Sequence, residues 1–418
     1  MYMLLQFNFK NYKSFRDDTT LDLTATKISE YEKHIVKVGG EQVLPIAAIF
    51  GANASGKSNV IEAFRYMYEY VLFSFNYGGD GKGGFVKPTP FIFDTNSKDA
   101  ESQFEVYFID DKDPRQRTYN YGFTIDSIGV LEEWLNIKSK TAKDSTRIFY
   151  RNRNNNELDL SGFSNKIKEN ILISLEKETL LVSLGSKLKI EKLKLIRDWF
   201  KNNAFADFGR PGENFFLSSV VPKNLGTDEN VRRNVLKYLQ VFDSSIVDLN
   251  VEVTLDDDVE KVKIDAIHKM ADGKGYASIP FQNESAGTLK MFALYPWLND
   301  ILQSGGVLFI DELNSKLHPL LVRVFIQTFL NQDLNPNNAQ LILTTHDSWL
   351  LNANIFRRDE IWLTEKQDNG VSQLYSLADF IDEDGDKIRK DENYEKNYLL
   401  GKYGAIPNLK CIDFFEEE

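Results

Sequence analysis

The stretch Gly51-Ala52-Asn53-Ala54-Ser55-Gly56-Lys57-Ser58 matches the pattern G-x-x-x-x-G-K-[ST] at every fixed position. The residues before it, Ile46 to Phe50, form a continuous apolar run, which is typical of a strand buried on both faces of a sheet. A helical pattern of apolar residues begins near Ser58 and continues to Val71. Because the pattern binds phosphate when it joins a strand to a helix, the stretch predicts a phosphate-binding loop in an α/β fold.

The residue types of this loop suit that chemistry. Glycines let backbone N–H groups point at phosphate oxygens without obstruction, and the following helix adds the positive end of its dipole. Lys57 is expected to bind the β- and γ-phosphates and to act in catalysis, and the Ser58 hydroxyl is expected to ligate Mg²⁺. We therefore expect ATP and Mg²⁺ as cofactors, and the predicted nucleotide-binding residues are Gly51, Ala52, Asn53, Ala54, Ser55, Gly56, Lys57, Ser58 and Asn59.

Two acidic residues end a second apolar run, Gly306 to Ile310. The run predicts a buried strand that delivers Asp311 and Glu312 to the sheet edge at which the phosphate loop lies. Asp311 is expected to hold Mg²⁺ through water, because this ion retains water ligands. Glu312 is expected to orient or deprotonate the water that attacks the γ-phosphate. Alone this pattern is a weak signal, and the phosphate loop makes it a strong one.

A histidine follows a third apolar run, Leu341 to Leu343, which predicts another buried strand with a polar cluster, Thr344 to Asp347, at its tip. We predict that this residue, His346, contacts the γ-phosphate or the attacking water. A purely structural histidine would be favoured for an isolated case, but the position one strand after the acid pair favours the functional interpretation. For His318, which precedes Pro319, the pattern favours neither interpretation.

A second candidate anion site begins at Glu284-Ser285-Ala286-Gly287-Thr288, just before a helical apolar pattern. A hydroxyl and a glycine at a helix start can bind an anion, although the same residues also form an ordinary helix cap. One subunit hardly needs two such sites for one nucleotide. We therefore predict that Ser285 and Gly287 contact the γ-phosphate bound by a second subunit.

The order of these motifs resembles the ABC ATPase superfamily. The opening stretch Phe7 to Phe15 and the stretch Asp311 to Pro319 resemble its SMC, RecF and OLD branches. Residues 284–294, 184–187 and 397–407 resemble bacterial OLD-like ATPases, which occur in abortive-infection and other phage-defence operons, including the RloA type.

The resemblance implies an α/β fold, an ABC-type P-loop ATPase head with an inserted, largely helical arm or lid. We expect residues 1–111 to form the first part of the head, 112–250 the insert, and 251–418 the second part. It further implies an ATPase that closes as a homodimer around ATP, assembles further in some settings, and controls a separately encoded effector such as a nuclease. DNA or a phage component is the expected trigger.

Other functions remain open at this point. A RecF- or SMC-like DNA clamp for repair is the main alternative, and a basic inner surface would favour it. A self-sufficient nuclease is a third possibility, but the stretch after His346 is short for a fused nuclease domain. A transporter subunit is the weakest, because the insert and the SMC-like opening argue against it.

Two positions depart from the family pattern. Asn314 stands where many relatives carry an aspartate, so communication between subunits through that loop is expected to differ. The glutamine that ligates the metal in relatives has no clear counterpart, and Gln103 is the candidate.

Composition restricts the remaining classes. The net charge is −12, which disfavours nucleic-acid binding over the whole surface. The single cysteine, Cys411, excludes a disulfide framework and fits a reducing compartment. No signal peptide or membrane-spanning run is recognisable, so we expect a cytoplasmic protein without membrane contact. Asp382, Asp384 and Asp386 resemble the start of a calcium loop, but Lys387 and Asn393 occupy its glycine and glutamate positions, so no calcium is expected.

Overall fold

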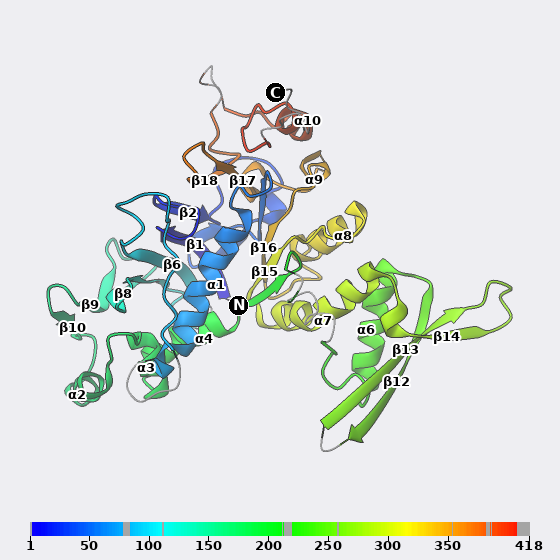
Figure 1. Ribbon diagram of the computed structural model, residues 1–418, viewed down its shortest axis with the longest axis horizontal. Coiled ribbons are helices and arrows are strands. Elements are labelled where there is room, and N and C mark those ends of the chain that lie inside the picture. The colour runs from blue at the N-terminus through cyan, green and yellow to red at the C-terminus, as the bar shows by residue number, and fades with distance from the viewer. Residues whose placement is uncertain are drawn as a thin grey trace, which may run out of the picture.

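Two large sheets and a smaller projecting unit dominate the fold (Figure 1). It is seen in a computed structural model that describes residues 2–77, 84–110, 113–210, 212, 220–256, 259–352, 354–381, 385 and 387–407. Cys411 and the three aspartates of the rejected calcium loop, Asp382, Asp384 and Asp386, lie outside the described residues.

The first sheet has six strands in the order β11-β15-β16-β5-β17-β18, and only the β17–β18 pair is antiparallel. Every residue of β5, β15 and β16 is buried, because this sheet has a core on both faces. The three apolar runs predicted as buried strands are thereby confirmed. The bounds are β5 Ile46–Gly51, β11 Ala204–Asp207, β15 Val307–Asp311, β16 Gln340–Thr344, β17 Ile361–Lys366 and β18 Ser372–Ser376.

The second sheet is antiparallel and has the order β10-β9-β8-β7-β6-β1-β2. Its strand β6 alternates buried and half-buried residues, as expected where one face meets a core and the other faces outward. The bounds are β1 Tyr2–Lys10, β2 Thr19–Asp22, β6 Ser102–Asp110, β7 Thr118–Ile125, β8 Val130–Lys138, β9 Thr146–Asn152 and β10 Glu157–Asp159.

Helix α1 (Lys57–Phe73) lies between the two sheets (Figure 1). The fully buried ring of Phe64 shows this position, because its centroid is 5.0 Å from that of Phe7 in β1 and 4.4 Å from that of Phe309 in β15. Burial of one such side chain contributes about 1.5–3 kcal/mol. The helix that follows the phosphate loop is therefore held from both sides.

A second core lies on the opposite face of the parallel sheet, under helices α7 (Ala286–Ser304), α8 (Pro319–Leu330) and α9 (Trp349–Asn352). Helix α10 (Tyr394–Leu399) packs beside α9. Short elements complete this part of the chain: η1 Glu32–His34, β3 Val36–Val38, β4 Glu41–Val43, η2 Ser74–Asn76, η3 Phe281–Asn283 and η4 Arg358–Glu360.

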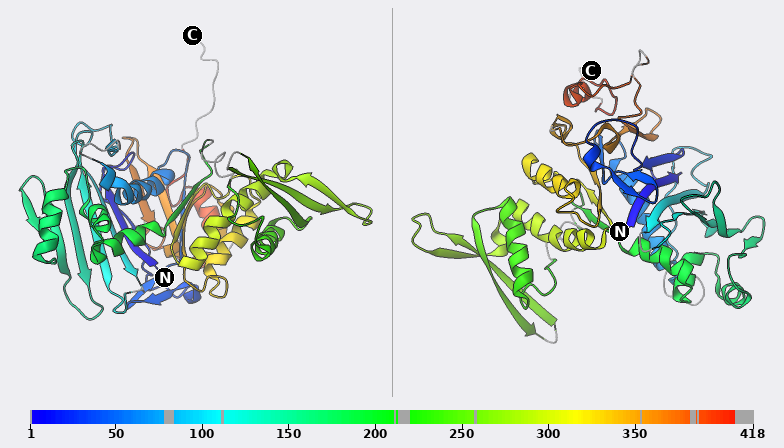
Figure 2. Two further views of the ribbon diagram at one scale, coloured as in Figure 1. Left: turned by 90° about the horizontal axis from the view of Figure 1, so that it is seen from below. Right: turned by 180° about the vertical axis from the view of Figure 1, so that it is seen from behind.

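The projecting unit consists of α6 (Glu229–Phe242) and a three-stranded antiparallel sheet, β12-β13-β14. Its strands are β12 Ile246–Asp256, β13 Val259–Lys269 and β14 Tyr276–Pro280. It has its own small core and extends away from the head beside α7 (Figures 1 and 2). Its core joins α7 through the rings of Phe281 and Phe292, whose centroids are 4.6 Å apart.

Residues 112–250, expected to form one inserted arm, are distributed over three places. Strands β7 to β10 extend the antiparallel sheet, and α2 (Asn165–Ser174), α3 (Leu181–Lys187) and α4 (Glu191–Lys201) follow them. Strand β11 then enters the parallel sheet, and α6 begins the projecting unit. The expected boundary at residue 250 falls inside β12. None of the described helices is long and apolar enough to cross a membrane.

Candidate nucleotide-binding site

The phosphate loop turns sharply at the end of β5. Positive φ angles occur at Gly51 (154°), Ala54 (62°) and Gly56 (114°). Glycine is required at position 56 for a second reason, because an added Cβ would lie 2.7 Å from the Oγ of Ser372. Asn53 and Ala54 are exposed at the tip of the loop, so its backbone is open to a ligand.

Lys57 begins α1, and its ammonium group is held by the loop itself. Nζ donates hydrogen bonds to the carbonyl oxygens of Gly51 and Ala52, both at 2.8 Å. Burial lowers the pKa of Lys57, and the nearby carboxylates of Asp311 and Glu312 partly oppose this shift. The acid pair therefore lies close enough to the lysine to act on it electrostatically.

Hydrogen bonds to side-chain hydroxyl groups of neighbouring segments hold the phosphate loop in place. Ser55 Oγ and Thr364 Oγ1 are 2.6 Å apart, and Ser372 Oγ donates to the Ser55 carbonyl oxygen at 2.7 Å. Asn59 Nδ2 donates to Ser14 Oγ at 2.7 Å, which ties α1 to the turn after β1. Ser55 and Asn59 thus support the loop, whereas Ser58 is half-buried beside it.

The acid pair lies at the C-terminal end of β15. Asp311 is 6% exposed and accepts a hydrogen bond from the Thr344 hydroxyl. Glu312 has a φ of +55°, a conformation that costs a non-glycine residue about 1–3 kcal/mol. The carboxyl group of Glu312 lies beside Gly209, and the Glu312 backbone N–H donates to Thr344 Oγ1 at 3.0 Å.

His346 follows β16, the strand that lies between β15 and β5. It is exposed, and the preceding residue is fixed by a hydrogen bond from Thr345 N to the carbonyl oxygen of Ile49 at 3.0 Å. The three strand ends therefore bring the phosphate loop, the acid pair and His346 to one edge of the sheet.

Ser285 and Gly287 lie at the start of α7. Ser285 is exposed, and its Oγ caps the helix by accepting a hydrogen bond from Thr288 N at 3.1 Å. Gly287 allows the helix to approach the loop after β15, because a Cβ there would lie 3.1 Å from the carbonyl oxygen of Lys316. The helix start thus adjoins the loop between β15 and α8, residues 312–318, named the acid-pair loop.

Gln103 is placed in β6, where it pairs with Lys10 and Thr124 of the antiparallel sheet. Asp207, not a glutamine, is in register with Asp311 on the neighbouring parallel strand. His318 caps α8, its Nδ1 accepting a hydrogen bond from Leu320 N at 3.2 Å.

The loop after β11 is a part of the site that the sequence analysis missed. Asp207 is buried, and Phe208 N donates to the carbonyl oxygen of Asp311 at 3.2 Å. A Cβ on Gly209 would lie 3.1 Å from Cδ of Glu312. The only available signal was the short run Ala204 to Asp207, which is too brief to reveal a strand by its pattern.

The residues of the phosphate loop and the acid pair fit a nucleotide bound together with Mg²⁺. Among the described residues no cluster of three or more His, Cys, Asp or Glu could hold a metal by itself. This suits Mg²⁺, which is usually bound by one or two protein ligands together with phosphates and water. Ser58 and Asp311 would supply those ligands, and the buried side chain of Lys57 would meet phosphate charge.

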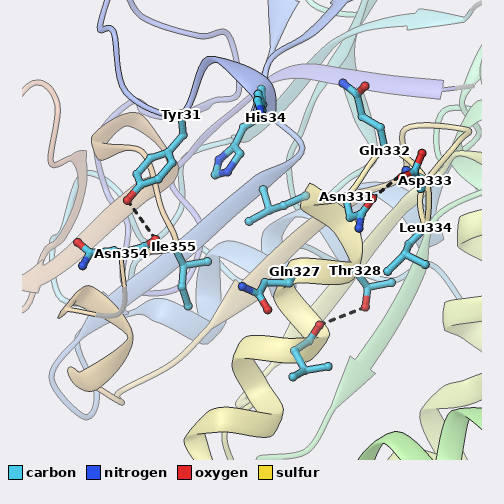
Figure 3. Close-up of a pocket in the computed structure, with 13 residues that line it drawn as sticks. Tyr31, His34, Gln327, Thr328, Asn331, Gln332, Asp333, Leu334, Asn354 and Ile355 are labelled. Atoms are coloured by element: carbon cyan, nitrogen blue, oxygen red, sulfur yellow. Dashed lines mark hydrogen bonds between the residues drawn. The ribbon is translucent and has the colours of Figure 1, made fainter.

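A cavity of about 1010 Å³ lies elsewhere (Figure 3). Its lining includes Tyr31, His34, Gln327, Asn331 and Asn354. These residues come from η1, from the C-terminal end of α8 and from the segment after α9. The chain passes from this end of α8 to the beginning of β16, so the cavity lies at the opposite edge of the parallel sheet from the phosphate loop.

The fold and this site define an α/β domain with a phosphate-binding P-loop. The chain belongs to the family described as "AAA domain, putative AbiEii toxin, Type IV TA system", whose model matches residues 46–352. A comparison with curated proteins gives no match. Among solved structures, the chain is similar to CbiO1 from Clostridium perfringens, part of the ABC transporter complex CbiONQ, with 12% identity, a TM-score of 0.31, and coverage of 88% of this chain and 86% of that one.

Proposed function

We propose that the chain binds and hydrolyses ATP as one half of a homodimer that closes around two ATP molecules. The observation that carries this proposal is the position of Ser285. This residue is exposed at the start of α7, next to the acid-pair loop. The start of α1 already serves the ATP bound by the same copy. The start of α7 is also suited to bind an anion, and contact with the γ-phosphate held by the opposite copy would explain why the chain has this second site.

Each residue then has a role in one composite site. Lys57 and the loop amides bind phosphate, and Ser58 and Asp311 hold Mg²⁺. Glu312 orients or deprotonates the attacking water, and His346 senses the γ-phosphate. Ser285 and Gly287 of the opposite copy complete the site. Hydrolysis removes the γ-phosphate and with it the contacts that favour closure.

We further propose that closure controls a separately encoded effector in phage defence, such as a nuclease or a toxin. The family description, which refers to a toxin–antitoxin system, supports this context. The projecting unit is the candidate contact for the effector, because it packs against α7 through Phe281 and Phe292 and through Tyr238 and Tyr295. A movement of α7 on closure would therefore be transmitted to it.

The dimer is tested with two variants. Glu312→Gln keeps the shape of the site but removes the base, so we expect it to bind ATP, to stop turnover and to accumulate a dimer in light scattering. Ser285→Arg places a large side chain at the closing surface, so we expect ATP binding by the monomer without dimer formation. An ATP-dependent dimer formed normally by Ser285→Arg would refute the composite site.

The effector is tested by affinity purification of Glu312→Gln from its native host with ATP present. Lys57→Ala, which is expected not to bind ATP, is the matched control. A stoichiometric nuclease or toxin-like protein recovered only with Glu312→Gln would support control of an effector. DNA recovered without a protein partner would refute it in favour of the repair clamp.

A further inference from the structure

Lys290 lies in the second turn of α7, and its side chain reaches the loop that follows β15. The residue is 5% exposed. Its Nζ donates hydrogen bonds to the carbonyl oxygens of Glu312 (3.2 Å), Leu313 (2.7 Å) and Ser315 (2.9 Å). The ring centroid of Phe208 lies 3.9 Å from the same nitrogen. The ammonium group is thus enclosed by the acid-pair loop and by the loop after β11.

These contacts hold three carbonyl groups of the acid-pair loop. An ammonium has three donors, and all three are used on carbonyl groups of this single loop. Burial lowers the pKa of Lys290 to about 7, and the negative charge of Glu312 partly opposes this shift. The positive φ of Glu312 persists only where the surroundings support it, and the adjoining carbonyl contact supplies such support.

Helix α7 touches the loop at a second point. Gly287 and Lys290 are three residues apart and therefore lie on the same face of the helix. Gly287 packs against the backbone of Lys316. Lys290 binds carbonyl groups of residues that precede Lys316 in the same loop. The start of α7 and the acid-pair loop are consequently joined along one helix face, with Ser285 at the exposed end.

We propose that Lys290 is a positioning residue that couples the two ATP sites of the dimer. This inference rests on the proposed function. Ser285 of one copy meets the ATP held by the opposite copy, and Lys290 transmits the resulting position of α7 to Glu312 of its own chain. ATP bound at one site thereby sets the hydrolytic carboxylate at the other site.

The first test is Lys290→Met, which keeps the length of the side chain and removes its donors. We expect ATP affinity and KM to stay within about 3-fold of wild type, because the phosphate loop is untouched. We expect kcat to fall at least about 10-fold, since three hydrogen bonds to the loop that begins with Glu312 are lost. Lys237→Met makes the same substitution at an exposed position of α6, away from the site, and is expected to retain kcat.

Mixed dimers of two differently tagged copies show whether Lys290 acts on Glu312 of its own chain. When Lys290→Met and Glu312→Gln are in the same copy, the other copy keeps its own lysine and glutamate, and about half of the wild-type rate is expected. When the substitutions are in opposite copies, no copy keeps both residues, and the rate should be about 5% of the wild-type rate or less. Equal rates for the two arrangements would overturn the proposal.

Melting temperatures and ATP affinities of all variants show whether they are folded. If wild type neither dimerises with ATP nor hydrolyses it, the proposed function fails. If wild type does both and a folded Lys290→Met variant keeps its kcat, only the coupling role fails.

Discussion

The hydroxyl of Thr344 donates a hydrogen bond to the carboxylate of Asp311 across the adjacent strands β16 and β15. The same oxygen accepts the backbone N–H of Glu312 at 3.0 Å. One buried hydroxyl thus orients the proposed metal ligand and fixes the backbone turn of the proposed base. The strand that ends near His346 therefore also sets the geometry of the acid pair.

Replacement of this hydroxyl tests the relationship. Thr344→Val keeps the shape of the side chain but leaves Asp311 without its donor and Glu312 N without its acceptor. Because a hydrogen bond to a charged group contributes about 1.5–3 kcal/mol, we expect kcat to fall by about 10- to 100-fold and the Mg²⁺ requirement to rise. Hydrolysis rates measured across a Mg²⁺ titration check this. Thr328→Val, on the exposed side of α8, is the control, and equal Mg²⁺ profiles for the two variants would contradict the role of Thr344.

The loop after β11 gives a second prediction. A side chain on residue 209 would press against the carboxylate of Glu312, because its Cβ alone would lie 3.1 Å from Cδ. Gly209→Val should therefore displace this carboxylate and lower kcat by about 10-fold, equivalent to about 1.4 kcal/mol. ATP binding, measured by calorimetry, should be unchanged. Gly212→Val, where an added Cβ meets no atom within 4 Å, is the control, and a loss of rate shared by both variants would refute the steric explanation.

Phosphate binding gives a third prediction. Lys57 provides the buried positive charge of the phosphate loop, so Lys57→Ala should remove measurable ATP binding. Since a charge-assisted contact is worth about 1.5–3 kcal/mol, and several meet at this residue, we expect a loss of at least about 100-fold in affinity. A fluorescent ATP analogue provides the measurement. Lys237→Ala, exposed on α6, is the control, and normal affinity in Lys57→Ala would show that the loop has been misassigned.

The central part of the site could be predicted because its signals are contiguous. The phosphate loop is a run of eight residues, Asp311 and Glu312 stand at the end of the apolar run confirmed as β15, and His346 comes two residues after β16. Parallel strands bring their C-terminal ends to one edge, so three separate stretches of sequence predict one location.

Other features depend on which strand pairs with which, and no local pattern contains that information. Strand β11 has four residues, and only its pairing with β15 places Asp207 beside Asp311. In the same way, β7 to β10 join a sheet that starts at the N-terminus, whereas β12 to β14 form a separate sheet over α6. Lys290 could not be singled out either, because a lysine in a helix is normally solvated.

The position of α1 between the sheets leads to a last prediction, about stability. Phe64 is fully buried and contacts aromatic rings of both sheets, so Phe64→Ala leaves a cavity at the centre of the head. Such truncations cost about 3–5 kcal/mol, which should lower the midpoint of urea denaturation clearly. Phe73→Ala on the same helix truncates a side chain that is 48% exposed, and its midpoint should stay close to that of wild type, within about 0.5 kcal/mol. If both variants lost equal stability, α1 would not be held between two cores. A selective loss in Phe64→Ala should also weaken ATP binding near the new midpoint, because the same helix begins with Lys57 and carries the phosphate loop at its N-terminus.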